Sequence, residues 1–345
     1  MKRIAGLLIG ILMAVTFLCI VLLPQKGVEA KEGETDTNGF TIKGGILAAY
    51  EGEERNITIP PNVTEIGPEA FKNSRLETVT IPGTVRKIDS RSFYGSENLY
   101  RVILQDGVKE IGSSAFSCCW KLDKVIIPAS VDTIAPGAFS YCNALSELEL
   151  SSDNVNFFYN DGVLYNRDST ELIQYLAGRK SSYYSMPFSV KKVDRYAFWG
   201  AELLRDVTIS NNVKTIEPYT FANCTGLASI YLPESVTKIE ANAFKGCSNL
   251  TYVGTESAVK TEEDAFKDCA KSLKVENGVE KQQQPNLPNP PFRTQIKVIN
   301  TISGSSIPGT ETIPEINRTE PEGLMGASRI VGGNALVILS ENRAR

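Results

Sequence analysis

The chain of 345 residues contains no histidine. Histidine is the commonest general base, the usual partner of nucleophilic serine or cysteine, and a frequent zinc ligand. Its absence excludes all three kinds of site. Also missing are the phosphate-binding loop G-x-x-x-x-G-K-[ST], the nucleophile motif G-x-S-x-G and the dinucleotide fingerprint G-x-G-x-x-G. A glycosidase-like pair of carboxylates has no sequence signature, and nothing in the chain points to one. We expect no enzyme activity, no cofactor and no metal.

An excess of positive charge is missing too. The chain has 36 lysines and arginines against 40 aspartates and glutamates, a formal net charge of −4. Nucleic-acid binding depends on neutralising phosphates with basic side chains, so we expect no nucleic-acid partner. The fractions of 42% hydrophobic and 22% charged residues are those of a folded protein.

The first 30 residues are typical of a secretory signal peptide. Lys2 and Arg3 precede an apolar run over 4–23, and small residues surround a cleavage site after Ala30. The run also has the about 20 residues that a membrane span needs, so an uncleaved anchor is the alternative. Both interpretations predict a secreted or cell-surface protein that contacts a membrane only through this segment.

A pattern with a period of about 23 residues organises most of the chain. Residues 127–150, IPASVDTIAPGAFSYCNALSELEL, show it as I-P-x-x-V-x-x-I-x-x-x-A-F-x-x-C-x-x-L-x-x-V-x-I, with leucines in the last two apolar positions. Eight copies follow one another between residues 59 and 275, and the eighth is degraded. Such self-similarity predicts a solenoid in which each coil packs on its neighbours.

The fixed letters of the repeat have packing or turn roles. The L-x-x-V-x-I end alternates like a half-buried strand, and the next proline ends that strand. Pro68, Pro136 and Pro218 precede the A-F position of three repeats, which predicts a single helical turn starting at the proline. We therefore predict a β-rich repeat solenoid of about eight coils, with short helical turns and a parallel sheet.

The repeat also indicates the domain boundaries. Residues 31–58 form a leader and N-terminal cap, and residues 59–275 form the solenoid. A linker rich in proline and glutamine follows at 276–292, and a tail without repeats occupies 293–345. We leave the fold of the tail unassigned.

An insert at residues 151–185 interrupts the array. Two β-like runs, 163–165 and 172–175, flank the turn residues 166–170, which predicts a β-hairpin. The insert is similar to the N-terminal cap. The matching residues are Phe40, Gly45, Ile46 and Leu47 in the cap and Phe158, Gly162, Val163 and Leu164 in the insert. We expect the hairpin to continue the sheet.

The repeat, together with the N-D-G-V-L-Y-N-x-x-x-T-E-L-I-x-Y unit at 160–175, resembles the BspA-like leucine-rich repeat family of bacterial surface and secreted proteins. The resemblance covers roughly residues 40–275. The weak eighth coil, the third coil without proline and the tail depart from it. It implies a right-handed solenoid that adheres to proteins or glycans outside the cell, and it carries over no catalytic residue.

Five of the seven cysteines occupy one repeat position, three residues after the phenylalanine: Cys119, Cys142, Cys224, Cys247 and Cys269. Ser74, Ser96 and Ala201 occupy it in other coils. We expect a ladder of small buried thiols, with disulfides between neighbouring coils (119–142 or 224–247) as the alternative. Cys118 differs, because its position holds turn residues elsewhere, and we predict it to be accessible.

The outward positions of the main strands are free of these packing constraints. One row contains Arg101, Lys124, Glu147 and Asp206, and the row beside it contains Ile103, Ile126, Glu149 and Tyr231. Ile103 and Ile126 would form a small exposed apolar patch, which can mark an interaction site or be ordinary scatter. These eight residues are our candidate partner-binding surface.

Two classes of function stay open at this point. The first is an exported, non-catalytic binding or adhesion module, which we expect to be a monomer. The second is a structural scaffold or spacer that displays the tail. The sequence does not identify the protein or glycan partner.

Overall fold

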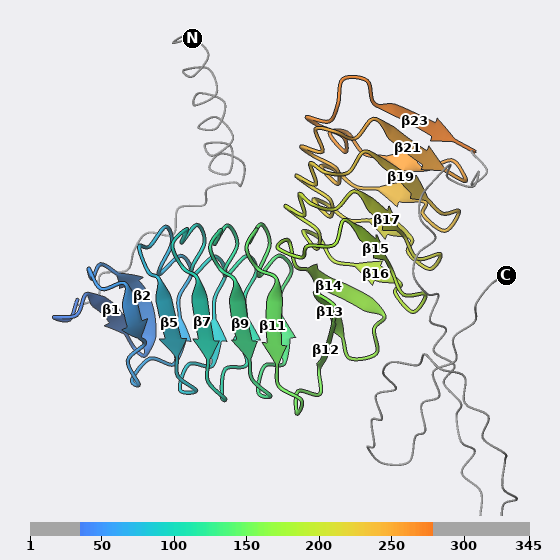
Figure 1. The fold of residues 1–345 in the computed structure, drawn as a ribbon. Helices are drawn as coiled ribbons and strands as arrows, with labels where there is room; N and C mark the ends of the chain where they lie inside the picture. The colour runs from blue at the N-terminus through green and yellow to red at the C-terminus, as the bar shows by residue number, and fades with distance from the viewer. Residues whose placement is uncertain (1–34, 279–345) are drawn as a thin grey trace, which may run out of the picture. The chain divides into compact units, whose positions relative to one another are not determined.

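The computed structural model describes residues 35–278, which form 23 strands and no helix (Figure 1). The predicted signal peptide, the tail and most of the linker lie outside the described residues. Within residues 35–278, the parallel-sheet solenoid expected from the repeat is present, with two strands in each regular coil.

The main ladder contains the strands predicted from L-x-x-V-x-I. It consists of sheets of five, two and three strands, ten in all. The five-stranded sheet contains β3 (Asn56–Thr58), β5 (Thr78–Ile81), β7 (Arg101–Leu104), β9 (Lys124–Ile127) and β11 (Glu147–Leu150). The others contain β15 (Tyr183–Ser185) with β17 (Asp206–Thr208), and β19 (Ser229–Leu232) with β21 (Tyr252–Thr255) and β23 (Lys274–Asn277). The two strands beyond the eight predicted coils are β3 and β15. We call residues 35–150 the first block and residues 183–278 the second block.

The minor ladder is built from the V-x-x-I part of each repeat. Its members are strands of two residues each: β4 (Glu65–Ile66), β6 (Lys87–Ile88), β8 (Glu110–Ile111), β10 (Thr133–Ile134), β16 (Lys192–Val193), β18 (Thr215–Ile216), β20 (Lys238–Ile239) and β22 (Lys260–Thr261). Apart from the exposed Thr261, the second residue of each is buried. Main and minor strands thus enclose the core from two sides.

The predicted helical turn is wrong. Each regular coil instead has two left-handed residues, one just before the A-F position and one two residues after the phenylalanine, with φ between 55° and 79°. A right-handed helix cannot continue through a residue in the left-handed conformation. In this segment, bonds between coils alternate with local turn bonds: Phe71 N–H donates to Ser92 C=O of the next coil at 2.7 Å, and Lys72 N–H donates to Glu69 C=O of its own coil at 3.0 Å.

A column of stacked phenylalanines fills the turn side of the core. Ring centroids are 4.7 Å apart for Phe71 and Phe93 and 4.9 Å apart for Phe93 and Phe116. In the second block the column begins at Tyr175 of the insert, whose ring lies 4.9 Å from that of Phe198. Because each ring contacts the rings above and below it, the coils stabilise one another as a solenoid requires.

The cysteine position provides a hydrogen-bond donor to the preceding coil. Each side chain bonds the carbonyl of that coil's phenylalanine, at 2.8 Å for Ser96 and 3.0–3.2 Å for Cys119, Cys142, Cys224, Cys247 and Cys269. All six cysteines among the described residues are free thiols. The buried ladder is therefore confirmed for these residues, although Cys269 is only half-buried, and the disulfide alternative is not what the structure contains.

The prediction that Cys118 is accessible is wrong. Its backbone is left-handed as the turn position requires, with φ of 61°, yet only 2% of the residue is exposed. Its N–H donates to Ser140 C=O of the next coil at 3.1 Å, and this bond holds the turn against its neighbour.

The cap and the insert join the minor ladder. In the cap, β1 (Phe40–Lys43) and β2 (Ile46–Tyr50) form a hairpin whose second strand pairs with β4. In the insert, β12 (Phe157–Asn160), β13 (Val163–Asn166) and β14 (Glu171–Tyr175) are antiparallel neighbours, and β14 pairs with β16. The predicted hairpin is thus present as β13 and β14, but it does not continue the main sheet.

Two details of the predicted insert are corrected. Aligned on the hairpin turns, Phe40 corresponds to Phe157, which is buried, and not to the exposed Phe158. The insert also ends before residue 185, because β15 belongs to the main ladder.

On the turn side the two blocks stay hydrogen-bonded, with Tyr141 N–H donating to Trp199 C=O at 3.1 Å. The insert therefore interrupts the main ladder and leaves this backbone bond between the blocks.

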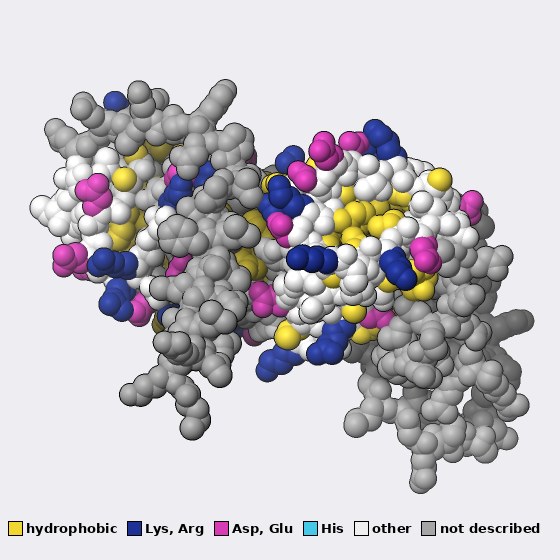
Figure 2. All heavy atoms as spheres, turned by 90° about the horizontal axis from the view of Figure 1, so that it is seen from above, with side chains coloured by type: hydrophobic (Ala, Val, Ile, Leu, Met, Phe, Trp, Pro, Cys, Tyr) yellow, Lys and Arg dark blue, Asp and Glu magenta, His cyan; other side chains and the backbone are white. Residues whose placement is uncertain are grey.

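The last coil leaves part of its apolar side uncovered. Val259, Phe266, Cys269 and Leu273 are only partly buried, and Val275 is exposed. Figure 2 looks down on this end of the second block, where apolar side chains gather between charged ones. Terminal repeats are expected to be atypical for this reason.

Candidate functional site

The outward residues of the first block form two continuous rows. Parallel pairing places Arg101 beside Lys124 and Lys124 beside Glu147. The second row runs from Ile103 to Ile126 and then to Glu149. Successive residues of a strand point to opposite faces, and the residues between these rows are buried. Six of the eight candidate residues therefore share one face of one sheet.

Four of these residues line a shallow depression. Arg101, Ile103, Lys124 and Ile126 surround a volume of about 170 Å³. The two isoleucines are half-buried between the charged side chains. Their methyl groups form a small apolar floor with a basic rim, which suits a partner that offers an apolar group next to an anionic or polar one.

A charged cluster borders this depression. The Lys124 ammonium lies 2.9 Å from a Glu149 carboxylate oxygen and 3.6 Å from a Glu147 oxygen. The hydrogen bond with Glu149 raises the pKa of Lys124, so the lysine stays charged at neutral pH. Two carboxylates share one ammonium here, and the cluster carries a net negative charge at the β11 end of the rows.

The remaining two candidates lie elsewhere. Asp206 is on β17 and Tyr231 is on β19, in the two sheets of the second block. The Tyr231 ring packs 5.4 Å from the ring of Tyr252. The structure therefore does not place these residues on the same sheet as the other six.

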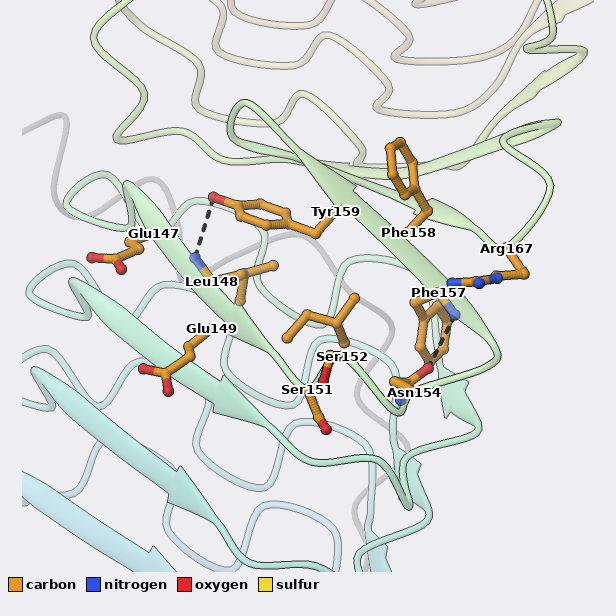
Figure 3. A pocket seen from close by; sticks show the side chains of 11 residues that line it. Glu147, Leu148, Glu149, Ser151, Ser152, Asn154, Phe157, Phe158, Tyr159 and Arg167 are labelled. Carbon is orange, nitrogen blue, oxygen red and sulfur yellow. Dashed lines mark hydrogen bonds between the residues drawn. The ribbon is translucent and has the colours of Figure 1, made fainter. Parts of the chain in front are cut away.

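A larger pocket lies beside β11 (Figure 3). It has a volume of about 360 Å³ and extends from the carboxylates of β11 to the insert. Its lining comprises Glu147 to Ser152, Asn154, Phe157, Phe158, Tyr159 and Arg167. In Figure 3, Phe158 points away from β11, Arg167 reaches toward Phe157, and Tyr159 reaches toward Leu148.

Hydrogen bonds hold the walls of this pocket. The buried Asn154 donates through Nδ2 to Val131 C=O at 2.9 Å, and its Oδ1 accepts from Phe157 N–H at 3.1 Å. The Tyr159 hydroxyl accepts from Leu148 N–H at 3.3 Å, and burial raises the pKa of this tyrosine. Phe158 has no such role and is 42% exposed. The pocket thus has fixed walls and one exposed aromatic ring.

Sequence reasoning missed the pocket residues of the insert. Glu147 and Glu149 were identified as variable letters of the repeat, whereas Phe158, Tyr159 and Arg167 belong to no repeat position. The F-F-Y run at 157–159 could have revealed them. Successive side chains of a strand point to opposite faces, so both phenylalanines cannot be buried in the same core.

Two kinds of feature are absent from the part of the chain that the structure describes. No group of three or more metal-ligating side chains occurs within residues 35–278. The same residues include no helix with the length and hydropathy needed to cross a membrane. The charged and aromatic groups of the site lie on an open surface, where they can contact a partner without enclosing a substrate.

Comparison with known proteins agrees with the repeat. The family model described as BspA type Leucine rich repeat region matches six copies, over residues 50–171 and 176–281. This is well over half of the chain, and the chain belongs to this family. Membership indicates a binding or scaffold role, and these repeat proteins are generally not catalytic. No curated protein matches the chain.

One of the similar solved structures shows the same fold. A leucine-rich repeat protein from Eubacterium ventriosum is 24% identical, with a TM-score of 0.52, over 67% of this chain and 77% of that one. A leucine rich cell surface protein from Faecalibacterium prausnitzii is 23% identical, with a TM-score of 0.40, over 73% of this chain and 96% of that one.

Proposed function

We propose that this member of the BspA-type leucine-rich repeat family is an exported, non-catalytic binding or adhesion protein. It recognises a protein or glycan outside the cell through the outward face of the first block. The observation that carries the proposal is the adjacency of two hollows on this face, one lined by Arg101, Ile103, Lys124 and Ile126 and the other beginning at Glu147 and Glu149.

The physical support is that these positions are not needed for packing. The repeat requires its inward letters for the core, whereas the outward letters change from coil to coil. The isoleucines between the two cations expose apolar surface where an outward strand face is usually polar. Exposed apolar patches of this kind mark interaction sites. Families of surface repeat proteins use such extended faces for partners.

The test replaces Arg101, Ile103, Lys124 and Ile126 together by alanine. We expect an unchanged thermal transition, within a few degrees, and weaker binding to partners found by screening matrix proteins, cells and glycan arrays. A matched variant changes Asp206 and Tyr231 to alanine in the second block. Unchanged binding by the first variant, with loss in the second, would move the site to the second block and overturn the proposal.

A scaffold role is the second candidate. The observation in its favour is that the chain continues from residue 279 to residue 345 after the last coil. If the solenoid is only a spacer, a chain ending at residue 278 should bind nothing in the screen that the full chain binds. If the proposed surface is the site, the shortened chain should bind as well as the full one.

A further inference from the structure

The strand β11 is the edge of its sheet. It is the terminal member of the five-stranded sheet, and within residues 35–278 its only strand partner is β9. The next strand of the main ladder, β15, pairs with β17 instead, because the insert lies between them in the chain. Edge strands offer backbone N–H and C=O groups to which another chain can pair.

The direction of these backbone groups follows from the ladder. Ser151 N–H donates to Ile127 C=O beside β9 at 2.9 Å. Successive residues of a strand alternate in the side to which their peptide groups point, so the groups of Leu148 and Leu150 face away from β9. The bond from Leu148 N–H to the Tyr159 hydroxyl confirms this direction. A phenol oxygen thus occupies the place of a pairing strand's carbonyl.

The pocket provides room along this edge. Its lining includes every residue from Glu147 to Ser152, so it follows the whole strand. The volume of about 360 Å³ lies within the roughly 300–1,000 Å³ of small-molecule sites. The buried Phe157 and the exposed Phe158 both border it, from opposite faces of β12. A side chain that points inward from an added strand would lie on the Phe157 side.

The charges select the composition of such a strand. Glu147 and Glu149 have side-chain exposures of 62% and 57%, and Lys124 pairs with both. Lys124 approaches them from β9, and an added strand would approach from the other side, where opposite charges placed across two strands are favourable. Arg167 on the insert side disfavours a further cation there. Basic residues therefore belong beside the glutamates, with apolar residues between them.

We infer that the free edge of β11 binds an extended peptide of alternating basic and apolar residues as an added strand. The basic side chains pair with Glu147 and Glu149 on the outward face, and the apolar ones enter the pocket on the Phe157 side. This inference names the partner chemistry of the binding role proposed above and rests on it. Strand addition of this kind combines backbone bonds for affinity with side-chain pockets for specificity.

The experiment measures the binding of short labelled peptides to the full chain by fluorescence anisotropy. The first probe alternates lysine and valine, and a second replaces lysine by glutamate. Two further probes carry the lysine–valine sequence with N-methyl groups on alternate backbone nitrogens, one probe for each edge of the peptide. N-methylation removes the pairing donors and leaves the side chains unchanged.

Strand addition predicts an asymmetric result. One N-methylated isomer should bind about tenfold more weakly or worse, since it leaves buried backbone groups unpaired, and the other should bind like the parent. The glutamate probe should bind more weakly than the lysine probe. Equal binding of both isomers would overturn the strand, equal binding of the glutamate probe would overturn the charge assignment, and no binding of the lysine probe would overturn both.

Protein variants test the same edge. Glu147→Gln with Glu149→Gln should weaken the lysine probe, and Glu97→Gln, on an exposed turn outside the site, should not. Leu150→Pro removes the N–H that faces the pocket and should weaken binding, with circular dichroism as the check of folding. Tyr159→Phe removes the hydroxyl that occupies Leu148 N–H and should strengthen binding. Weaker binding of Tyr159→Phe would contradict the inference.

The two proposals fail in different ways. If the lysine probe does not bind but screened partners lose affinity on the four alanine substitutions, the strand inference is wrong and the binding function stands. If the probe binds at β11 but those substitutions affect no partner, the surface proposed for the function is wrong.

Discussion

The donor position of the repeat gives a prediction with its own internal control. Cys142 donates its thiol to Phe116 C=O at 3.1 Å, and both groups are buried. The same carbonyl also accepts from Cys119 N–H at 3.3 Å, so it keeps one partner when the thiol is removed. Ser96 shows that a hydroxyl fits the equivalent position, with a bond of 2.8 Å to Phe71 C=O.

We expect Cys142→Ala to lower the free energy of unfolding by about 1–2 kcal/mol. One net hydrogen bond accounts for about 1 kcal/mol, and the buried sulfur, comparable to one methylene, for about 0.8 kcal/mol. Cys142→Ser keeps the donor and loses only the apolar contribution, so it should cost less than alanine.

Ala201 occupies the same position where the donor is unnecessary. It lies in the first coil of the second block, and the residue that corresponds to the preceding phenylalanine is Tyr175. The Tyr175 carbonyl already accepts from Gln174 Nε2 at 3.0 Å. Ala201→Ser should therefore gain less than one full hydrogen bond, because the Tyr175 carbonyl that the hydroxyl would reach already has a partner.

The assay is urea denaturation followed by tryptophan fluorescence, comparing midpoints at unchanged slope. Trp120 precedes the Cys142 coil and Trp199 precedes Ala201, so the two tryptophans of the chain report on the two sites. Cys142→Ser as costly as Cys142→Ala would refute the donor role and leave the thiols as apolar filling.

Two further predictions concern the pH dependence of stability and the reactivity of the thiols. Burial raises the pKa of Asp194 to about 6, although a hydrogen bond with Lys192 lowers it. Because the folded-state pKa is raised, this group stabilises the fold at low pH, and the stabilisation is lost as the pH rises through about 6. The wild type should therefore gain thermal stability as the pH is lowered from about 6 toward 4, and Asp194→Asn should not; an equal gain in both would contradict the assignment. The hydrogen bond with Cys247 lowers the pKa of Cys269, which is also the least buried of the described thiols. Thiol labelling of the native chain with peptide mapping should therefore modify Cys269 first and Cys118 only on unfolding; equally fast labelling of Cys118 would contradict its burial.

The repeat could be predicted because its causes are local. Apolar letters at fixed spacing determine which residues face inward, and stacking follows because a lone coil cannot bury them. The pairing of Arg101 with Lys124 and of Ile103 with Ile126 results directly from this register. The shared depression was therefore implied by the sequence, whereas its volume and its partner were not.

The turn was harder to predict because its sequence has two explanations. Proline before A-F suits the first position of a helix, and it equally suits a turn that a left-handed residue interrupts. The residues before the alanine include Tyr196 and Tyr219, both with positive φ, although bulky residues rarely adopt that conformation. Contacts between coils outweigh the local preference there, and no single-coil argument includes them.

The sequence by itself determined the period, the inward and outward faces, the free thiols' position and the two rows on β7, β9 and β11. The tertiary structure alone decided that the insert joins the minor ladder, that Cys118 is buried, that Asp206 and Tyr231 lie in other sheets, and that β11 ends its sheet beside a pocket. The physical reason is the range of the interactions. Periodic letters encode contacts between neighbouring coils, whereas the pocket depends on contacts between a repeat strand and a non-repeating insert, for which the sequence has no period.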